Sequence, residues 1–213
     1  MPSVLRVLLT LACPMCGAPG RAPCAACTQQ LRPAPQLPPP VGVDACLALL
    51  AYDGAGRELV ARLKYHNQRG ALAGLARAMA SLVADPASID VVTWAPTTAQ
   101  RRRQRGFDQA ELLARPVARA LHRPCRALLV RQPGPPQTGL SLAERRGGPH
   151  LQPRRAIPGW SVLVVDDVVT SGSTAAVAAL ALRRGGASSV VVLAAARTPR
   201  PSRAGSTRAR APQ

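Results

Sequence analysis

Short runs of consecutive apolar residues alternate along this chain with segments in which apolar residues recur every three or four positions. The runs predict buried β-strands, and the periodic segments predict amphipathic helices. The expected strands cover residues 46–52, 89–94, 126–130, 161–165 and 190–195, and the expected helices cover residues 56–65, 71–83, 107–121 and 173–185. Strands that alternate with helices predict an α/β fold with a mainly parallel, helix-covered sheet. Pro116 is expected to kink or shorten the third helix.

Composition divides the chain into four parts. Residues 1–31 combine an apolar start, expected to form a short packing helix, with four cysteines, and the Pro-rich residues 32–40 predict a linker. Residues 41–198 form the expected main domain, and residues 199–213 an expected disordered tail, whose run of Arg without acids begins at Arg197. No run of about 18 apolar residues exists, so we expect no membrane insertion and a cytoplasmic protein.

The charge balance is strongly basic. The 213 residues include 28 Lys and Arg against 10 Asp and Glu, a formal net charge of +18 that would attract polyanions. Lys64 is the single Lys, and the abundance of Arg, Ala and Pro indicates GC-rich coding as much as function. Only five residues are aromatic, which disfavours most modules that stack nucleic-acid bases on aromatic rings.

Four of the six cysteines form two C-x2-C pairs that are separated by seven residues. Such paired knuckles place four thiolates for tetrahedral Zn²⁺ and leave no open coordination position, which predicts a structural site. The alternative is a set of redox-active or adventitious thiols. The four are Cys13, Cys16, Cys24 and Cys27. The remaining two, Cys46 and Cys125, lie in or beside apolar strands and are expected to be buried packing thiols.

The most informative segment covers residues 162–174. A buried apolar strand is expected to end at Asp166 and Asp167, and a small hydroxylic loop with one glycine then opens a helix. The N–H groups of a helix start suit a phosphate, and carboxylates accept hydrogen bonds from sugar hydroxyls, so the segment predicts a ribose 5-phosphate site. The loop residues are Thr170, Ser171, Gly172, Ser173 and Thr174. The alternative is a simple helix-capping turn.

Three other classes of α/β protein are excluded by the sequence. Lys64 lies in no G-x4-G-K-[ST] motif, as a Walker-type nucleoside triphosphatase requires. The paired acids of a response-regulator receiver open its domain, whereas only 46 residues follow Asp167 here. The pair Gly54 and Gly56 lacks the third glycine of a dinucleotide-binding fingerprint.

Four parts of the sequence resemble known families. Residues 162–174 resemble the phosphoribosyl pyrophosphate (PRPP) signature of type I phosphoribosyltransferases. The stretch Arg105-Gly-Phe-Asp-Gln109, the stretch from Gln137 to Arg145 and the cysteine quartet together resemble the ComF (competence protein F) family. Two features depart from that family, because Asp108 replaces its usual Asn and residues 147–150 interrupt the stretch after the Glu-Arg pair.

The resemblance implies a type I phosphoribosyltransferase-like sheet that binds PRPP and Mg²⁺ and transfers phosphoribose to or from a base or an amine. It implies that Asp166 and Asp167 hold the ribose hydroxyls, directly or through Mg²⁺-bound water, and that residues 170–174 hold the 5-phosphate. Arg102 and Arg105 would receive pyrophosphate, although a plain solvated basic loop is the alternative. Residues 132–149 would form a closing loop, in which Gln137 and Arg145 contact ligand, or an ordinary surface excursion.

Two further readings remain open. The ComF family is linked to natural competence, so the chain is alternatively a non-catalytic adaptor of single-stranded DNA uptake that contacts DNA or a translocating helicase. A nucleotide-sensing regulator would use the same pocket. A homodimer is compatible with any of these functions.

Overall fold

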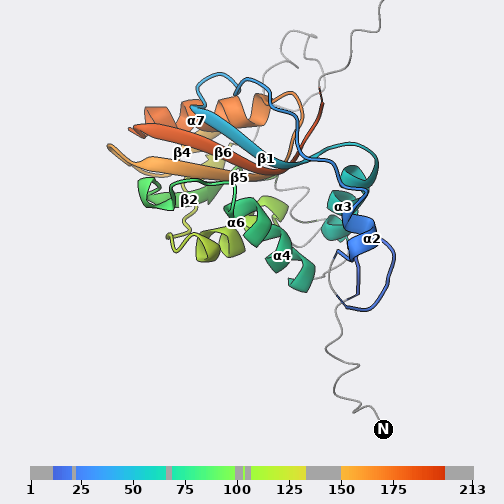
Figure 1. Cartoon of the computed structure of the whole chain (residues 1–213). Coiled ribbons are helices and arrows are strands. Elements are labelled where there is room, and N and C mark those ends of the chain that lie inside the picture. The colour runs from blue at the N-terminus through green and yellow to red at the C-terminus, as the bar shows by residue number, and fades with distance from the viewer. Residues whose placement is uncertain are drawn as a thin grey trace, which may run out of the picture.

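The computed structural model describes residues 12–20, 23–65, 69–98, 103, 107–132 and 150–199 (Figure 1). The helices are α2 (Ala25–Thr28), α3 (Gly54–Tyr65), α4 (Arg69–Ala80), α6 (Gln109–Ala120) and α7 (Ser173–Arg184), with a 3-10 turn η1 (Pro86–Ser88). The strands are β1 (Ala45–Ala51), β2 (Val91–Trp94), β3 (Leu129–Arg131), β4 (Leu151–Pro153), β5 (Ser161–Val169) and β6 (Ser189–Arg197). None of the described helices is long and apolar enough to cross a membrane.

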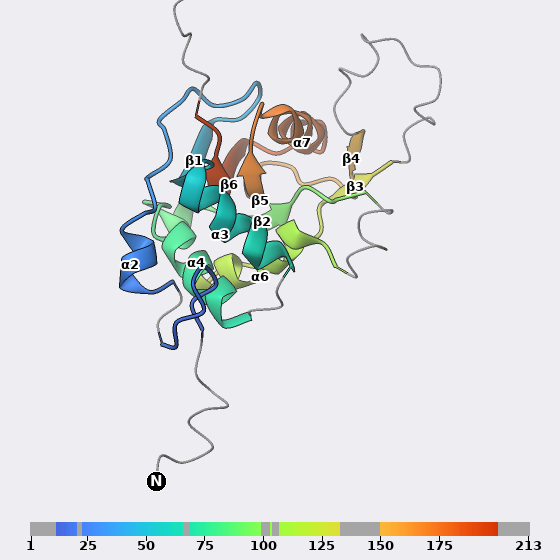
Figure 2. The ribbon, with the colours of Figure 1, turned by 90° about the vertical axis from the view of Figure 1, so that its right-hand side faces the viewer.

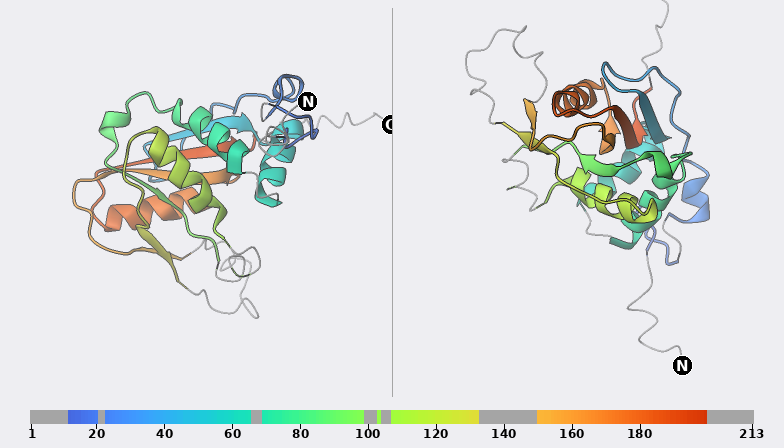
Figure 3. Two further views of the ribbon diagram at one scale, coloured as in Figure 1. Left: turned by 90° about the horizontal axis from the view of Figure 1, so that it is seen from below. Right: turned by 90° about the vertical axis from the view of Figure 1, so that its left-hand side faces the viewer.

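A four-stranded parallel sheet in the order β1-β6-β5-β2 forms the centre of the molecule, which confirms the α/β prediction. Helices α3, α4 and α6 cover one face, and α7 covers the other (Figure 2). Strands β3 and β4 pair antiparallel and extend the structure beyond β2 (Figure 3). The result is three layers, with both faces of the central strands buried.

The apolar run of β5 explains its central place in the sheet. Leu163 and Val165 point toward α4 and α6, whereas Val162 and Val164 point toward α7, because successive side chains of a strand face opposite sides. All four are at most 1% exposed. A strand that is apolar on both sides is stable only between two helical layers.

The structure differs from the predicted elements in β5 and in β4. β5 continues through Asp166 to Val169, four residues beyond its expected end, since its pairing with β6 persists to Arg197. Strand β4 lies in a segment expected to be irregular, and its Pro153 occupies the edge of a two-stranded sheet, where a missing N–H is tolerated. The expected helical turn near residues 140–146 lies outside the described residues.

Helix α6 runs through Pro116 as a single 12-residue element, so the expected shortening does not occur. Arg197, expected to begin the disordered tail, instead lies inside β6 and is 7% exposed. The apolar start of the chain, up to residue 11, lies outside the described residues, as does the tail from residue 200.

Residues 32–40, which we name the strap, lie along the edge of the sheet. Pro33 forms an antiparallel bridge with Leu50 of β1, and the Ala51 N–H donates to the Arg32 carbonyl at 2.9 Å. The cysteine segment before the strap shares the core beneath α3 and α4, because Cys13 and Cys27 are buried in the same hydrophobic cluster. The N-terminal part of the chain is therefore packed onto the α/β layers.

We predict that Gly56→Ala destabilises the fold by about 1–3 kcal/mol, although alanine is ordinarily the better helix former. A Cβ atom at this position would lie 2.1 Å from the Ala51 carbonyl oxygen, a backbone atom that cannot move aside. Urea unfolding followed by circular dichroism measures the change. The neighbouring Ala55→Gly serves as control and should cost no more than about 1 kcal/mol. A neutral or stabilising Gly56→Ala would contradict the close approach of α3 to β1.

Candidate functional site

The carboxyl end of β5 leads directly into a tight turn and then into α7. Gly172 occupies the N-cap position with a φ of 78°, which is a left-handed conformation that side-chain-bearing residues rarely adopt. Because glycine has no side chain, α7 has no side-chain cap at this position. The Ser173 N–H makes only a 3.4 Å contact with the Ser171 Oγ. The first N–H groups of this 12-residue helix therefore retain capacity to bind an acceptor.

Asp166 and the turn share one hollow of about 200 Å³, part of which is open to solvent. Its walls are formed by Asp166, Val168 and Thr170 at the end of β5 and by residues 172–175 at the start of α7. The structure thus brings together one predicted carboxylate and the predicted loop residues Thr170, Gly172, Ser173 and Thr174. Ser171 is adjacent, and its Oγ lies 3.1 Å from the Ser173 Oγ.

Asp167 lies on the opposite side of the strand. Because β5 continues past both acids, their side chains alternate, and Asp167 borders a second hollow beneath α3, α4 and α6. The Asp167 N–H donates to the Asp166 Oδ1 at 2.7 Å, which orients the first carboxylate. The two acids expected side by side at the end of the strand therefore face different layers.

A buried cation supports the hollow beside α7. The Arg197 guanidinium donates to the Leu37 carbonyl at 2.9 Å and to the Pro38 carbonyl at 2.7 Å, which holds the strap over the end of the sheet. Burial raises the pKa of the Cys46 thiol; the Arg197 charge lowers it and the Asp166 charge raises it, so both charges lie near this thiol. Pro40 of the strap stands so close to Gly172 that a Cβ there would come within 2.7 Å of its Cγ.

One carboxylate, that of Asp108, joins the two ends of the loop that follows β2 and carries Arg102 and Arg105. Asp108 accepts hydrogen bonds from the Thr97 N–H at 2.8 Å and, as the N-cap of α6, from the Ala110 N–H at 3.2 Å. Asp108 is 6% exposed, and burial raises the pKa of its carboxyl, although the backbone N–H groups act in the other direction. Both ends of the loop are thus fixed at the carboxyl end of β2, next to β5.

Four of the predicted ligand contacts, Arg102, Arg105, Gln137 and Arg145, lie outside the described residues. One arginine that sequence reasoning did not select lies close to their expected place. The Arg131 Nη1 donates to the Pro96 carbonyl at 3.3 Å, and Pro96 begins the basic loop. Nothing in the sequence links Arg131 or Arg197 to the site, because their contacts join distant segments. Asp108 was recognisable as a helix N-cap.

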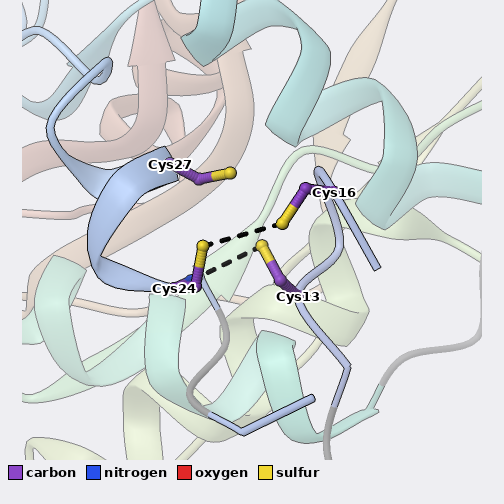
Figure 4. A group of neighbouring side chains, drawn as sticks. All are labelled: Cys13, Cys16, Cys24 and Cys27. Atoms are coloured by element: carbon purple, nitrogen blue, oxygen red, sulfur yellow. Dashed lines mark hydrogen bonds between the residues drawn. The ribbon is translucent and has the colours of Figure 1, made fainter. Parts of the chain in front are cut away.

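The four cysteines of the predicted zinc knuckles converge (Figure 4). Their Sγ atoms lie within 4.8 Å of one another, and the Sγ atoms of Cys16 and Cys24 are 3.6 Å apart. A tetrahedral site with Zn–S bonds of about 2.3 Å needs sulfur atoms about 3.8 Å apart, so the cluster fits Zn²⁺. Cys13 and Cys27 are buried, whereas Cys16 is exposed.

The thiols of this cluster differ in acidity before any metal is considered. Burial favours the neutral thiol of Cys13, but hydrogen bonds from the Cys24, Cys16 and Met15 backbone outweigh it and lower its pKa to about 6. Burial raises the pKa of Cys27 to about 12, helped by the neighbouring thiols. A cluster of four converging thiols, one of which loses its proton readily, is suited to bind a metal cation.

No family model matches the sequence, and no curated protein matches it significantly. Twenty-three chains of solved structures match. One is the allosteric regulatory enzyme of purine biosynthesis, with 26% identity, a TM-score of 0.43, and coverage of 59% of this chain and 25% of that chain. Another is the glutamine PRPP amidotransferase from B. subtilis in complex with ADP and GMP, with 26% identity, a TM-score of 0.42, and coverage of 58% and 26%. This chain spans about a quarter of the length of these proteins.

We predict that Asp108→Asn gains stability relative to the native protein as the pH rises from 4 to 7. The raised pKa means that the folded state holds the Asp108 proton more tightly than the unfolded state. The stability that this proton contributes is therefore lost as pH rises from the ordinary value of 3.8 through the folded pKa. Asn keeps an acceptor and carries no charge.

Urea unfolding of both proteins at pH 4 and pH 7 measures this difference. Asp108→Ala is the companion variant and should lose about 1–2 kcal/mol at either pH, because the Thr97 N–H and the first turn of α6 lose their acceptor. If the stability of Asp108→Asn relative to the native protein instead falls as the pH rises, the buried carboxylate is stabilised by contacts other than those described above.

Proposed function

We propose that the chain binds PRPP at the carboxyl end of β5 and transfers its phosphoribosyl group to a nitrogen acceptor. The observation that carries this proposal is the shared hollow of Asp166 and the turn before α7. The turn offers N–H groups at a positive helix end for the 5-phosphate, and Asp166 in the same hollow offers oxygens for ribose hydroxyls.

Each of these groups at the carboxyl end of the sheet has a role in this proposal. The 170–174 turn holds the 5-phosphate, and Asp166 holds the ribose hydroxyls, directly or through water on Mg²⁺. Asp167, which the family resemblance also assigns to these hydroxyls, borders the other hollow. Arg102 and Arg105 receive the pyrophosphate, while Gln137 and Arg145 close over it. Positioning and charge then stabilise the cation-like ribose as pyrophosphate leaves.

A carboxylate beside a polyphosphate is the usual protein contribution to a Mg²⁺ site, so Asp166 fits this ion. When bound, Mg²⁺ neutralises charge on the pyrophosphate. The overall charge of +18 also favours a ligand with several phosphate groups.

Isothermal titration with PRPP in the presence of Mg²⁺ tests this proposal. We expect saturable binding that Asp166→Asn weakens at least tenfold, because the ribose loses a charged acceptor. Glu58→Gln is the matched control, since it removes one exposed carboxylate of α3 that pairs with Arg62. Absence of PRPP binding, or equal binding by Asp166→Asn, would overturn the proposal.

The second candidate is the DNA adaptor implied by the resemblance to the ComF family. It is favoured by the excess of 28 cations over 10 acids, which suits the backbone of single-stranded DNA or a DNA-bound helicase. In this case DNA affinity would survive Asp166→Asn and fall when Arg101, Arg102 and Arg103 are neutralised. Asp166→Asn therefore separates the two functions, because it should weaken PRPP binding and leave DNA binding unchanged.

We also propose that the cysteine cluster holds one structural zinc ion. Metal analysis of the purified full chain should find one zinc per chain, and Cys13→Ser with Cys16→Ser should abolish it. The loss should also lower the melting temperature, because Cys13 and Cys27 belong to the core beneath α3 and α4. Cys125→Ser is the control and should retain the metal, as Cys125 lies outside the cluster. Zinc retained by the double variant would show that the ion binds elsewhere.

A further inference from the structure

Gly172 is buried, although Ser171 and Ser173 on either side of it are exposed. A Cβ atom built on Gly172 would lie 2.7 Å from the Cγ and 3.1 Å from the Cβ of Pro40, and no other described atom outside the neighbouring residues lies within 4 Å of it. Because a Cβ atom stands only about 1.5 Å from its Cα, the Pro40 ring is in van der Waals contact with this glycine. The strap therefore covers the middle residue of the turn.

The turn has few contacts of its own that would fix Gly172. Glycine has more backbone freedom than any other residue, and a glycine N-cap offers no side chain to the N–H groups of α7. The Gly172 carbonyl accepts from the Ala176 N–H at 2.9 Å, which orders the helix side of the turn only. The contact between the Oγ atoms of Ser171 and Ser173 lies at the surface. The Pro40 ring is thus the described contact that restrains Gly172 from outside the turn.

The strap is stiff where it approaches the turn. Residues 38–40 are three consecutive prolines, whose rings fix φ and favour an extended polyproline conformation. Proline has no N–H group, so these residues can be held only through their carbonyls. The Pro40 carbonyl accepts from the Val43 N–H at 3.1 Å, which fixes the end of the strap as the chain enters β1.

Arg197 fixes the other end of this stiff segment. Its planar guanidinium suits two successive carbonyls, and it donates to Leu37 at 2.9 Å and to Pro38 at 2.7 Å. Arg197 is paired in register with Val169, the last residue of β5, and the Thr198 N–H donates to the Val169 carbonyl at 3.0 Å. One residue therefore joins the strap to the strand from which the turn begins.

We propose that Arg197 and Pro40 are positioning residues for the turn that holds the 5-phosphate. Arg197 fixes the strap, the three prolines maintain the distance from this anchor to the turn, and the Pro40 ring keeps Gly172 in its left-handed conformation. The assignment rests on the proposed PRPP function, because a turn that is ordered before binding lowers the conformational cost of holding phosphate. Both residues act through the turn rather than through contact with the ligand.

The ligand-free test measures the order parameter of the Gly172 amide by ¹⁵N relaxation of the full chain. We expect a value of about 0.8 in the native protein and below about 0.6 in Pro40→Gly and in Arg197→Met, because each variant removes one part of the restraint. Pro35→Gly is the matched control, since it removes a ring from the same strap before the segment that Arg197 holds. An unchanged Gly172 order parameter in Pro40→Gly would overturn the proposal, even if Arg197→Met failed to fold.

Titration with PRPP and Mg²⁺ tests the same variants at a temperature where circular dichroism shows each of them folded. We expect Pro40→Gly and Arg197→Met to raise the Kd at least fivefold and Arg197→Lys, which keeps a charged donor, to raise it less. A merely structural role would lower the melting temperature and leave this Kd unchanged. The double variant should bind no more weakly than the weaker single variant, because both changes act by one route. Multiplied losses would show that Arg197 acts independently of Pro40 and would overturn the proposal.

The two measurements separate this inference from the proposed function. If the native chain binds PRPP and both single variants bind it equally well, the positioning role is wrong and the proposed function stands. If the native chain binds no PRPP while the Gly172 amide becomes mobile in both variants, the proposed function is wrong and the strap still orders the turn.

Discussion

The burial of β5 on both faces is the constraint on which the candidate sites depend. Four fully apolar residues, 162–165, can exist only between two helical layers, and this places the next residues at the carboxyl edge of the sheet. The pleat then sends Asp166 toward α7 and Asp167 toward α6. One strand therefore delivers a carboxylate to each of two hollows, and the distance between the hollows is fixed by the thickness of the sheet.

The strap links the cysteine cluster to the same edge. It begins just after α2, bridges to β1 at Pro33, and reaches the Gly172 turn at Pro40. Arg197 holds its middle through two carbonyl oxygens, so the guanidinium is buried with partners that offset its desolvation. The strap therefore connects the cysteine segment to the turn before α7 through these contacts.

The sequence predicted the layers and the turn because both follow from local sequence patterns. Apolar runs and helical periodicity located the central strands, and the glycine with hydroxylic neighbours located the start of α7. The sequence did not show that β5 continues past its acids, because the added residues are held by pairing with β6 rather than by their own pattern. The role of Arg197 was also hidden, since it depends on contacts with the strap, which lies far away in the chain.

Asp44 at the amino end of the sheet and the start of α7 at the carboxyl end differ in how completely their polar groups are satisfied. At the amino end, Asp44 accepts from the Val190 N–H at 2.7 Å, the Ser189 Oγ at 3.1 Å and the Arg183 Nη2 at 2.6 Å, and these contacts lower its pKa. At the carboxyl end, α7 starts without a side-chain cap, Asp108 is buried with a raised pKa, and the Gln109 Oε1 lacks a described donor. The carboxyl end of the sheet therefore holds described polar groups that the chain does not fully satisfy, and this unused capacity is the physical basis for placing the proposed ligand there.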